Sequence, residues 1–298
     1  MDAASAEARL ARAVRAARDD LRARYPVLVD DTAWSWDGAP VVSGSVLVAA
    51  QAMTYQRAVG AAFDLAPVDV PRPGVLTDPD VDFRAVAWGQ LTGVGAVDLF
   101  AKADGADLQT QWPADAHVRH FHDASARSLV QLPDLTVGWV DADRVEATTV
   151  DADPWTALQR MPAGELGAGG PLSGVASVAR RRLGRPYLWG GNTEDAADCS
   201  GYVQAVLLEA TGWLLPKNTR DQMKRGVRVA VSGIAAGDLV FVRGRDKGLM
   251  HVGVALPTDD GVSVIHSCLS RNVVLEETLP AFLERYRFTA ARRVLEWT

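Results

Sequence analysis

A turn-rich stretch that leads into a cysteine constrains the fold of this chain more than any other segment. Residues 184–192 read Gly-Arg-Pro-Tyr-Leu-Trp-Gly-Gly-Asn, and residues 198–201 read Asp-Cys-Ser-Gly. From Tyr202 on, apolar residues recur at the spacing of a helix that faces a core, and Gly212 is placed to end this helix. Cys199 is therefore predicted at a helix N-terminus, where free N–H groups and the helix dipole favour an anion and lower the pKa of a thiol. This position favours a nucleophile over a structural cysteine.

Two histidines downstream of the cysteine lie on predicted strands. Residues 238–243, 251–256 and 261–266 read as consecutive strands and predict an antiparallel sheet. His251 opens the second segment, and His266 ends the third after an apolar row. A cysteine paired with a histidine that a third group orients is the general arrangement of an activated thiol. A metal site is the alternative for such residues, but no CxxC or HxxxH spacing supports it.

These separated motifs resemble the NlpC/P60 family of cysteine peptidases, which cut bacterial cell-wall peptides. The matching residues run in order from about 170 to 298, and they are Tyr187-Leu-Trp-Gly-Gly191, Asp198-Cys-Ser-Gly201, Pro216 with Thr219 and Gln222, Ala236-Gly-Asp-Leu-Val-Phe241, His251-Val-Gly253 and Ile265-His266. The resemblance implies an α+β, papain-like fold in which the helix that bears the cysteine packs on an antiparallel sheet. It also implies that Cys199 is the nucleophile, His251 the base and His266 the group that orients the base, with Tyr187 close to the thiol.

The resemblance also points to residues around the nucleophile that contact the substrate. These are Tyr187, Trp189, Asp198, Ser200, Asn218 and Asp221. Trp189 and the two glycines after it also fit a purely architectural turn, because glycine reaches backbone conformations that strain other residues. Relatives that bind a free amine have an aspartate in a Pro-Arg-Asp stretch, where this chain has Asn218. Asn218 can hydrogen-bond an ammonium group but cannot neutralise it, and Asp221 is a substitute three residues on.

The residues before the cysteine domain predict β-rich modules. Residues 1–25 read as a helix with one apolar stripe, and a strand over 41–48 and a helix over 51–63 follow. Short strands with turn signals are predicted at 85–88, 96–100, 116–122, 128–132 and 136–140. The last two, ending in Gly-Trp-Val, resemble the closing strands of a bacterial SH3 domain. The predicted division is an N-terminal helix (1–25), a β-rich SH3-like module (26–94), an SH3 domain (95–150), a linker (151–172) and a catalytic domain (173–298).

Composition narrows the possible partners and the compartment. The net charge of -6 argues against nucleic acid or an anionic membrane as the main partner. The chain has only two cysteines, Cys199 and Cys268, so it offers no disulfide framework and suits a reducing compartment. The first 25 residues contain no apolar core of a secretory signal, and no segment approaches the length of a membrane span. We therefore expect a cytoplasmic protein without a cofactor, a metal ion or a membrane span.

A thiolate on a helix that faces a histidine is suited to acyl transfer from an amide or an ester. The family resemblance narrows the substrate to peptides derived from peptidoglycan. Its combination with SH3-like modules resembles enzymes of cell-wall recycling, which cut the γ-D-glutamyl–diamino acid bond of released peptides with a free N-terminal L-Ala. Two alternatives stay open: a non-catalytic protein that binds cell-wall peptides, and an acyl or amide transferase on the same fold. The preferred diamino acid and the oligomeric state also stay open.

Overall fold

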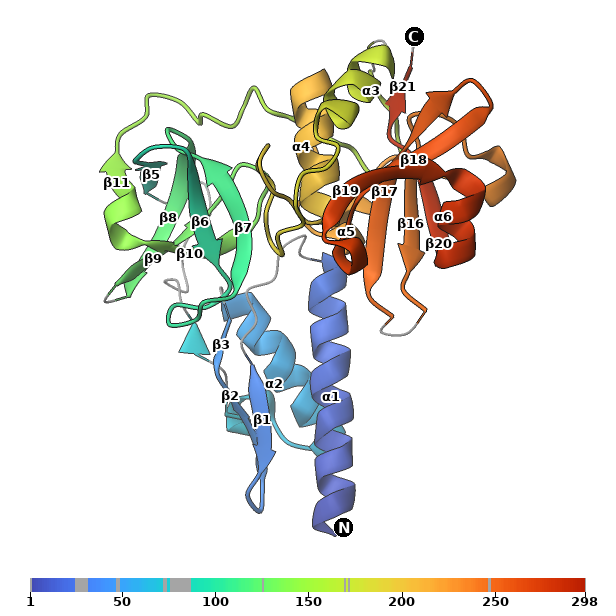
Figure 1. Ribbon diagram of the computed structural model, residues 1–298. Helices are drawn as coiled ribbons and strands as arrows, with labels where there is room; N and C mark the ends of the chain where they lie inside the picture. Colours follow the sequence, from blue (N-terminus) through green and yellow to red (C-terminus); the bar gives the residue numbers. More distant parts are fainter. Residues whose placement is uncertain are drawn as a thin grey trace.

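The protein consists of three groups of helices and strands that differ in architecture (Figure 1). The computed structural model describes residues 2–24, 32–46, 49–71, 74–75, 87–124, 126–168, 170, 172–245 and 248–297. The N-terminus lies at the far end of helix α1, and the C-terminus lies at the opposite end of the molecule (Figure 1). Helices and antiparallel sheets occur together in these residues, so the predicted α+β class is confirmed.

The first group is built on two helices, α1 (Ala3–Arg24) and α2 (Ala49–Phe63), which pack against each other. Their shared core buries the apolar stripe of α1, including Leu10 and Val14, as its periodicity predicts. The strands are β1 (Ala33–Trp36) with β2 (Pro40–Ser43), and β3 (Ser45–Val46) with β4 (Gly74–Val75), and a 3-10 turn, η1 (Pro67–Asp69), follows α2. The strand predicted over 41–48 is divided by Gly44, whose φ of +84° interrupts it, and residues 47–48 lie outside the described residues.

The second group is a seven-stranded sheet with the order β11-β5-β8-β9-β10-β6-β7. Its elements are β5 (Trp88–Leu91), β6 (Ala96–Phe100), β7 (Leu108–Pro113), β8 (His117–Ala124), β9 (Arg127–Gln131), β10 (Val137–Asp141), the 3-10 turn η2 (Ala142–Arg144) and β11 (Val145–Thr148). The strand predicted at 96–100 is confirmed, and those at 116–122, 128–132 and 136–140 are shifted by one or two residues. β5 precedes the boundary predicted after residue 94 but pairs with β8 and β11, so this sheet extends across that boundary.

The third group is a six-stranded antiparallel sheet with the order β15-β20-β16-β17-β18-β19. Its strands are β15 (Val227–Val229), β16 (Leu239–Arg243), β17 (Met250–Thr258), β18 (Gly261–Cys268), β19 (Val273–Thr278) and β20 (Arg287–Arg293). The helices and 3-10 turns are α3 (Leu172–Arg181), α4 (Cys199–Thr211), α5 (Thr219–Gln222), η3 (Val231–Gly233), η4 (Leu269–Arg271) and α6 (Leu279–Arg285). The antiparallel sheet that the two histidine segments predict is thus confirmed.

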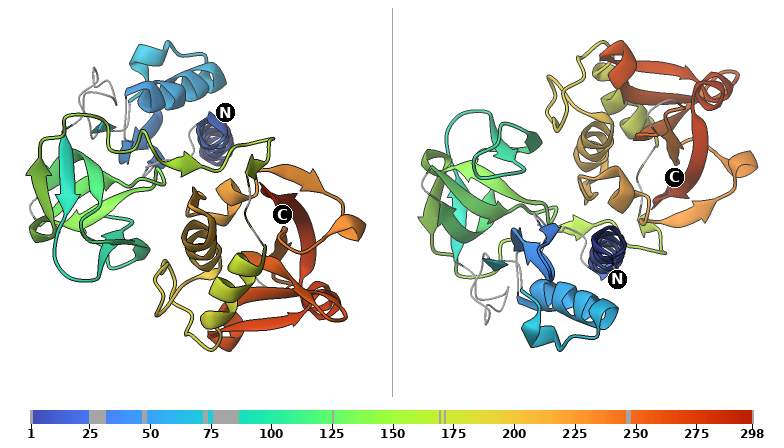
Figure 2. Two further views of the ribbon diagram at one scale, coloured as in Figure 1. Left: turned by 90° about the horizontal axis from the view of Figure 1, so that it is seen from above. Right: turned by 90° about the horizontal axis from the view of Figure 1, so that it is seen from below.

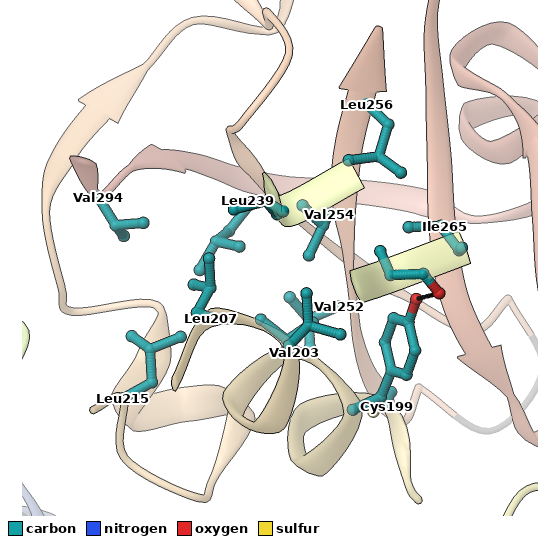
Figure 3. Packing of buried hydrophobic residues seen from close by; sticks show 14 of the residues in the cluster. Cys199, Val203, Leu207, Leu215, Leu239, Val252, Val254, Leu256, Ile265 and Val294 are labelled. Atoms are coloured by element: carbon teal, nitrogen blue, oxygen red, sulfur yellow. Dashed lines mark hydrogen bonds between the residues drawn. The ribbon is translucent and has the colours of Figure 1, made fainter. Parts of the chain in front are cut away.

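Helix α4 covers one face of this sheet, and α6 contributes to the core on the other face. Val203 and Leu207 of α4 point at Val252, Val254 and other side chains of the sheet (Figure 3). The contact is fully apolar, and these four residues are completely buried. Burial of this face therefore holds the start of α4 at a fixed place above strand β17.

The segment between the two larger sheets is attached to both of them. Its two short strands pair in parallel, β12 (Gln159–Arg160) with β14 (Trp213–Leu214), and β13 (Gly167–Ala168) with β21 (Leu295–Glu296). Trp155 is buried, and its indole N–H donates to the carbonyl of His117 at 3.0 Å. The segment predicted as a linker therefore lies packed on its neighbours over much of its length.

The seven-stranded sheet also contacts helix α4 directly, and the views in Figures 1 and 2 both place α4 between the two sheets. Leu214 and Leu208 join the apolar core of the seven-stranded sheet. Beside them, the buried Asp134 carboxylate accepts a hydrogen bond from the Gln204 amide at 2.7 Å. A buried carboxylate needs such a partner, so this contact fixes the seven-stranded sheet against the helix that bears Cys199.

Candidate active site

Cys199 is the first residue of α4, as its sequence context predicts. The preceding Asp198 caps the helix: its carboxylate accepts hydrogen bonds from the Gly201 N–H at 2.7 Å and the Ser200 hydroxyl at 3.1 Å. Gly201 is required for packing, because a Cβ there would lie 2.1 Å from the carbonyl oxygen of Gly191. The Asp-Cys-Ser-Gly sequence therefore holds the turn before the helix tightly against the first helical turn, and the thiol opens into a cleft.

The two histidines lie on neighbouring strands, β17 and β18, and they are in contact. His251 Nε2 is 2.7 Å from His266 Nδ1, and His266 Nε2 is 2.9 Å from a carboxylate oxygen of Glu277 on β19. Because the carboxylate can only accept, His266 carries its proton on Nε2, and its Nδ1 accepts from His251 Nε2. The second nitrogen of His251, Nδ1, therefore keeps a free lone pair, as a base requires. Gly253 makes room for this arrangement, since a Cβ there would lie 2.5 Å from a methyl group of Val264 and 3.0 Å from the His266 Cβ.

Aromatic rings enclose the histidine pair. The Tyr286 ring centroid lies 5.1 Å from that of His251, and the Phe282 ring centroid lies 4.9 Å from that of His266. Burial lowers the pKa of His251 well below 6.5, and the neighbouring His266 acts in the same direction. Burial also lowers the pKa of His266, against the opposing effect of Glu277. Both imidazoles are therefore neutral at neutral pH.

The thiol of Cys199 does not have the low pKa that its place at a helix N-terminus predicts. Burial raises its pKa to about 11, and the charge of Asp198 acts in the same direction, while Lys217 and a contact with Thr219 oppose them. The expectation was wrong because Cys199 is only 7% exposed, and loss of solvent outweighs the helix dipole. The resting site therefore holds a neutral thiol and a neutral imidazole, and a proton must move when the sulfur attacks.

The cleft around Cys199 has a volume of about 1290 Å³ and brings together eight of the nine site residues predicted from the sequence. They are Tyr187, Trp189, Asp198, Cys199, Ser200, Asn218, Asp221 and His251. The ninth, His266, lies behind His251 and does not line the cleft. Trp189 is 59% exposed, so its ring is available at the rim. Asp198 and Ser200, in contrast, are buried and hydrogen-bond to each other.

Three residues at the site were missed in the sequence. Glu277 completes the chain from His251 through His266, and its other oxygen pairs with Arg285 at 2.8 Å. Lys217 is buried and pairs with Asp198 at 2.6 Å. Tyr286 covers His251. Glu277 reaches His266 because β18 pairs with β19, which sets Glu277 opposite Val264. This pairing exists only in the folded sheet, so no local pattern in the sequence indicates Glu277.

The seven-stranded sheet forms part of the lining of the cleft. Ala101, Asp107, Leu108 and Gln109, from the segment that leads into β7 and from β7 itself, line the same cleft as the thiol. The contact is close, because a Cβ on Gly190 would lie 2.4 Å from the Leu108 carbonyl oxygen. Gly190 also has a φ of +78°, so both the turn and this neighbour require glycine.

No group of three or more His, Cys, Asp or Glu side chains suited to a metal ion occurs among the described residues. In the same part of the chain, no helix is long and apolar enough to cross a membrane.

The chain belongs to the NlpC/P60 family, whose sequence model matches residues 184–293. It is 31% identical over 124 residues to the probable endopeptidase NlpC of Escherichia coli K12, covering 41% of this chain and 78% of that protein. It is 34% identical over 109 residues to the murein DD-endopeptidase MepS/murein LD-carboxypeptidase of the same strain, covering 37% of this chain and 55% of that protein, about half its length.

Two further comparisons concern a named peptidase and a solved structure. The chain is 34% identical over 113 residues to the γ-D-glutamyl-L-lysine dipeptidyl-peptidase of Bacillus subtilis 168, covering 37% of each chain. The solved NlpC/p60 domain of the peptidoglycan hydrolase SagA is 30% identical, with 41% of this chain and 97% of that domain covered and a TM-score of 0.34. The first group of elements and the seven-stranded sheet lie outside the residues that the family matches.

Proposed function

We propose that this protein is a cysteine peptidase that hydrolyses the γ-D-glutamyl–diamino acid bond of peptidoglycan-derived peptides with a free N-terminal L-Ala. The observation that carries the proposal is the hydrogen-bonded chain from His251 through His266 to Glu277, whose first member, His251, lines the same cleft as the helix-borne thiol of Cys199. Relatives named as endopeptidases, and one named a γ-D-glutamyl-L-lysine dipeptidyl-peptidase, support the reaction and the bond.

The proposed reaction begins with a proton transfer. Cys199 Sγ attacks the amide carbon while His251 Nδ1 takes the thiol proton, and the carbonyl oxygen becomes an oxyanion. The C–N bond then breaks, His251 returns its proton to the leaving amine, and a thioester remains on Cys199. Water attacks the thioester with His251 again as base, which releases the acid and restores the thiol. Glu277, through His266, stabilises the imidazolium that forms in both steps.

Tyr187 is placed to serve the oxyanion in this mechanism. It lines the cleft, and burial raises its pKa, with the charges of Cys199 and Asp198 acting in the same direction. Its hydroxyl therefore keeps its proton at any pH at which the enzyme works. A protonated hydroxyl beside the reacting carbonyl donates a hydrogen bond that strengthens as the oxyanion forms.

The part of the cleft lining that the seven-stranded sheet forms supports a short substrate. Asp107 and Leu108 line the cleft, and in this proposal they close it to a peptide that is still attached to sugar. The N-terminal ammonium group of the substrate would find the neutral Asn218 in this cleft. Three carboxylates also line it: Asp198 is paired with Lys217, Asp221 is paired with Lys224 at 2.9 Å, and Asp107 is exposed. Asp107 therefore supplies the negative charge that Asn218 lacks.

The test compares L-Ala-γ-D-Glu-diamino acid with the same peptide acetylated on its amine, with products identified by mass. We expect cleavage of the free peptide, at least tenfold slower cleavage of the acetylated one, and none by Cys199→Ala. Comparable rates on both peptides would refute the free-amine requirement and favour an enzyme of longer wall peptides. Binding without turnover would support a non-catalytic binding protein, and products extended by an added amine would support a transferase.

Two matched variants test how the amine is recognised. Asn218→Asp adds a carboxylate, so it should lower the KM for the free peptide and leave that for the acetylated peptide unchanged. Asp107→Asn removes a carboxylate with little change in side-chain size, so it should raise the KM for the free peptide only. A change of equal size with both peptides would contradict recognition of the ammonium group.

A further inference from the structure

A buried lysine lies beside the proposed nucleophile, and the mechanism above does not use it. The side chain of Lys217 is only 3% exposed, and its Nζ lies 2.6 Å from the Asp198 carboxylate. Lysine is almost never fully buried unless it is paired, because an ammonium group loses much hydration energy on burial. Lys217 also lines the same cleft as Cys199, so its charge acts close to the sulfur.

Its partner has two opposed effects on the site. The Asp198 carboxylate builds the turn before α4, since it accepts from the Gly190 N–H at 2.9 Å and from the Gly201 N–H at 2.7 Å. The same negative charge lies next to Cys199 and raises the pKa of its thiol, whereas the charge of Lys217 lowers it. An isolated carboxylate would therefore cap the helix and at the same time oppose a negative charge on the sulfur.

We propose that Lys217 is a positioning residue whose ammonium group neutralises the Asp198 carboxylate, so that this cap holds Cys199 without repelling the negative charge that forms on its sulfur. The inference rests on the proposed role of Cys199 as nucleophile. The charge of Asp198 also acts on Tyr187, and the charge of Lys217 also acts on the buried Asp134, while His251 and Tyr187 line the same cleft as the pair. Tyr187 and His251 are neutral at neutral pH, so the positive charge paired with the Asp198 carboxylate is that of Lys217.

The structure also shows why a lysine at this place is held rigidly. Lys217 precedes helix α5, whose Gln222 is completely buried and donates to the carbonyls of Ser200 and Pro216, both at 2.9 Å. The residue before Pro216, Leu215, accepts from the buried Gln204 amide at 2.8 Å. The backbone on both sides of Lys217 is thus tied to α4, and its Nζ stays within reach of Asp198.

The test measures alkylation of Cys199 by iodoacetamide as a function of pH in the full chain, with the modified residue identified by mass. This reaction needs no peptide, so its result stands even if the proposed substrate is wrong. In Lys217→Met, we expect alkylation at pH 8 to slow about tenfold and the pH profile to shift upward by about one unit, since one unit corresponds to a tenfold change in ionisation. Lys217→Arg, which keeps the charge, should stay close to wild type.

A double variant separates charge from packing. Asn is as good a helix cap as Asp, so Lys217→Met combined with Asp198→Asn should recover most of the lost alkylation rate. Asp198→Asn alone leaves Lys217 unopposed and should shift the profile downward, which keeps the test decisive if Lys217→Met fails to fold. A folded Lys217→Met with an unchanged profile, or an unchanged profile in Asp198→Asn, would overturn the proposal and leave Lys217 with a purely structural role.

Discussion

Glu277 ends the chain of hydrogen bonds that begins at His251, and its charge can be removed with little change in shape. In Glu277→Gln, the amide can offer either its oxygen or its NH₂ group to His266. The NH₂ group would reverse the tautomer of His266 and place a proton on the nitrogen of His251 that must act as base. Even with the correct tautomer, the negative charge that stabilises the His251 imidazolium is gone. Both effects predict a slower acylation step.

The size of the effect follows from the geometry. The Glu277 oxygen is separated from the His251 ring by two hydrogen bonds, of 2.9 and 2.7 Å, and the His266 ring between them. A charge about 7 Å away contributes about 2 kcal/mol at an effective dielectric constant of about 20. That energy corresponds to about 30-fold in rate. Arg285 pairs with the other oxygen of Glu277 at 2.8 Å and offsets part of this charge, so about 30-fold is an upper bound for the charge alone.

The assay is steady-state hydrolysis of the free peptide, with kcat and KM determined separately. We expect kcat to fall between about 5-fold and 30-fold while KM stays nearly constant, because Glu277 does not line the cleft. Glu276→Gln is the matched control: it is the same change on the same strand, but Glu276 pairs with Arg180 at 2.7 Å instead of a histidine. An unchanged kcat in a folded Glu277→Gln variant, or an equal loss in both variants, would refute the reasoning.

Three further predictions concern pH and stability. Because burial lowers the pKa of His251 well below 6.5, the base stays neutral in mild acid, and kcat/KM should show no acid limb near pH 6.5; a limb there would contradict the neutral pair. The folded thiol of Cys199 holds its proton to about pH 11, whereas an unfolded thiol loses it near 9.0, so the free energy of unfolding should fall by up to about 3 kcal/mol between these pH values. Thermal unfolding of Cys199→Ala should show a smaller decline, to which Tyr187 and Tyr202 still contribute because burial also raises their pKa values. A decline as large as that of the wild type would disprove the assignment. Gln204→Leu leaves the buried Asp134 without its amide and should cost about 2 kcal/mol or more in urea unfolding, whereas Asn192→Ala, which removes one bond to Gln204, should cost less.

The parts of the site that depend on local sequence could be predicted. The start of α4 at Cys199 follows from a cap residue, a small turn and an apolar repeat that lie within about fifteen residues of one another. The strands that carry His251 and His266 follow from short apolar runs between turn signals. The contact between the two imidazoles was expected only from the resemblance to the NlpC/P60 family, because it depends on the register of the two strands.

The remaining features depend on tertiary structure. The pKa of Cys199 is set by how completely the fold removes solvent from the thiol, and no local pattern carries that quantity. Lys217 reads as an ordinary surface lysine until α5 and α4 enclose it. The predicted domain boundary after residue 94 separates β5 from the rest of its sheet. The sequence does not indicate the pairing of β5 with β11, because the two strands are more than fifty residues apart. Pairings at such separation are not visible in hydrophobic periodicity.

The core that Leu208 and Leu214 share with the seven-stranded sheet limits how freely the domains of this protein can be recombined. A fragment that begins at residue 173 would expose Leu208 and Leu214 to solvent and leave Gln204 without Asp134. It would therefore carry an exposed apolar patch that the full chain buries. The residues of the seven-stranded sheet that line the cleft would be lost in the same cut, so the proposed substrate preference and the cover over this apolar patch would be removed together. The seven-stranded sheet can therefore be replaced only by a domain whose surface matches this face of α4. We expect a chimera that keeps the cleft residues but lacks such a surface to aggregate.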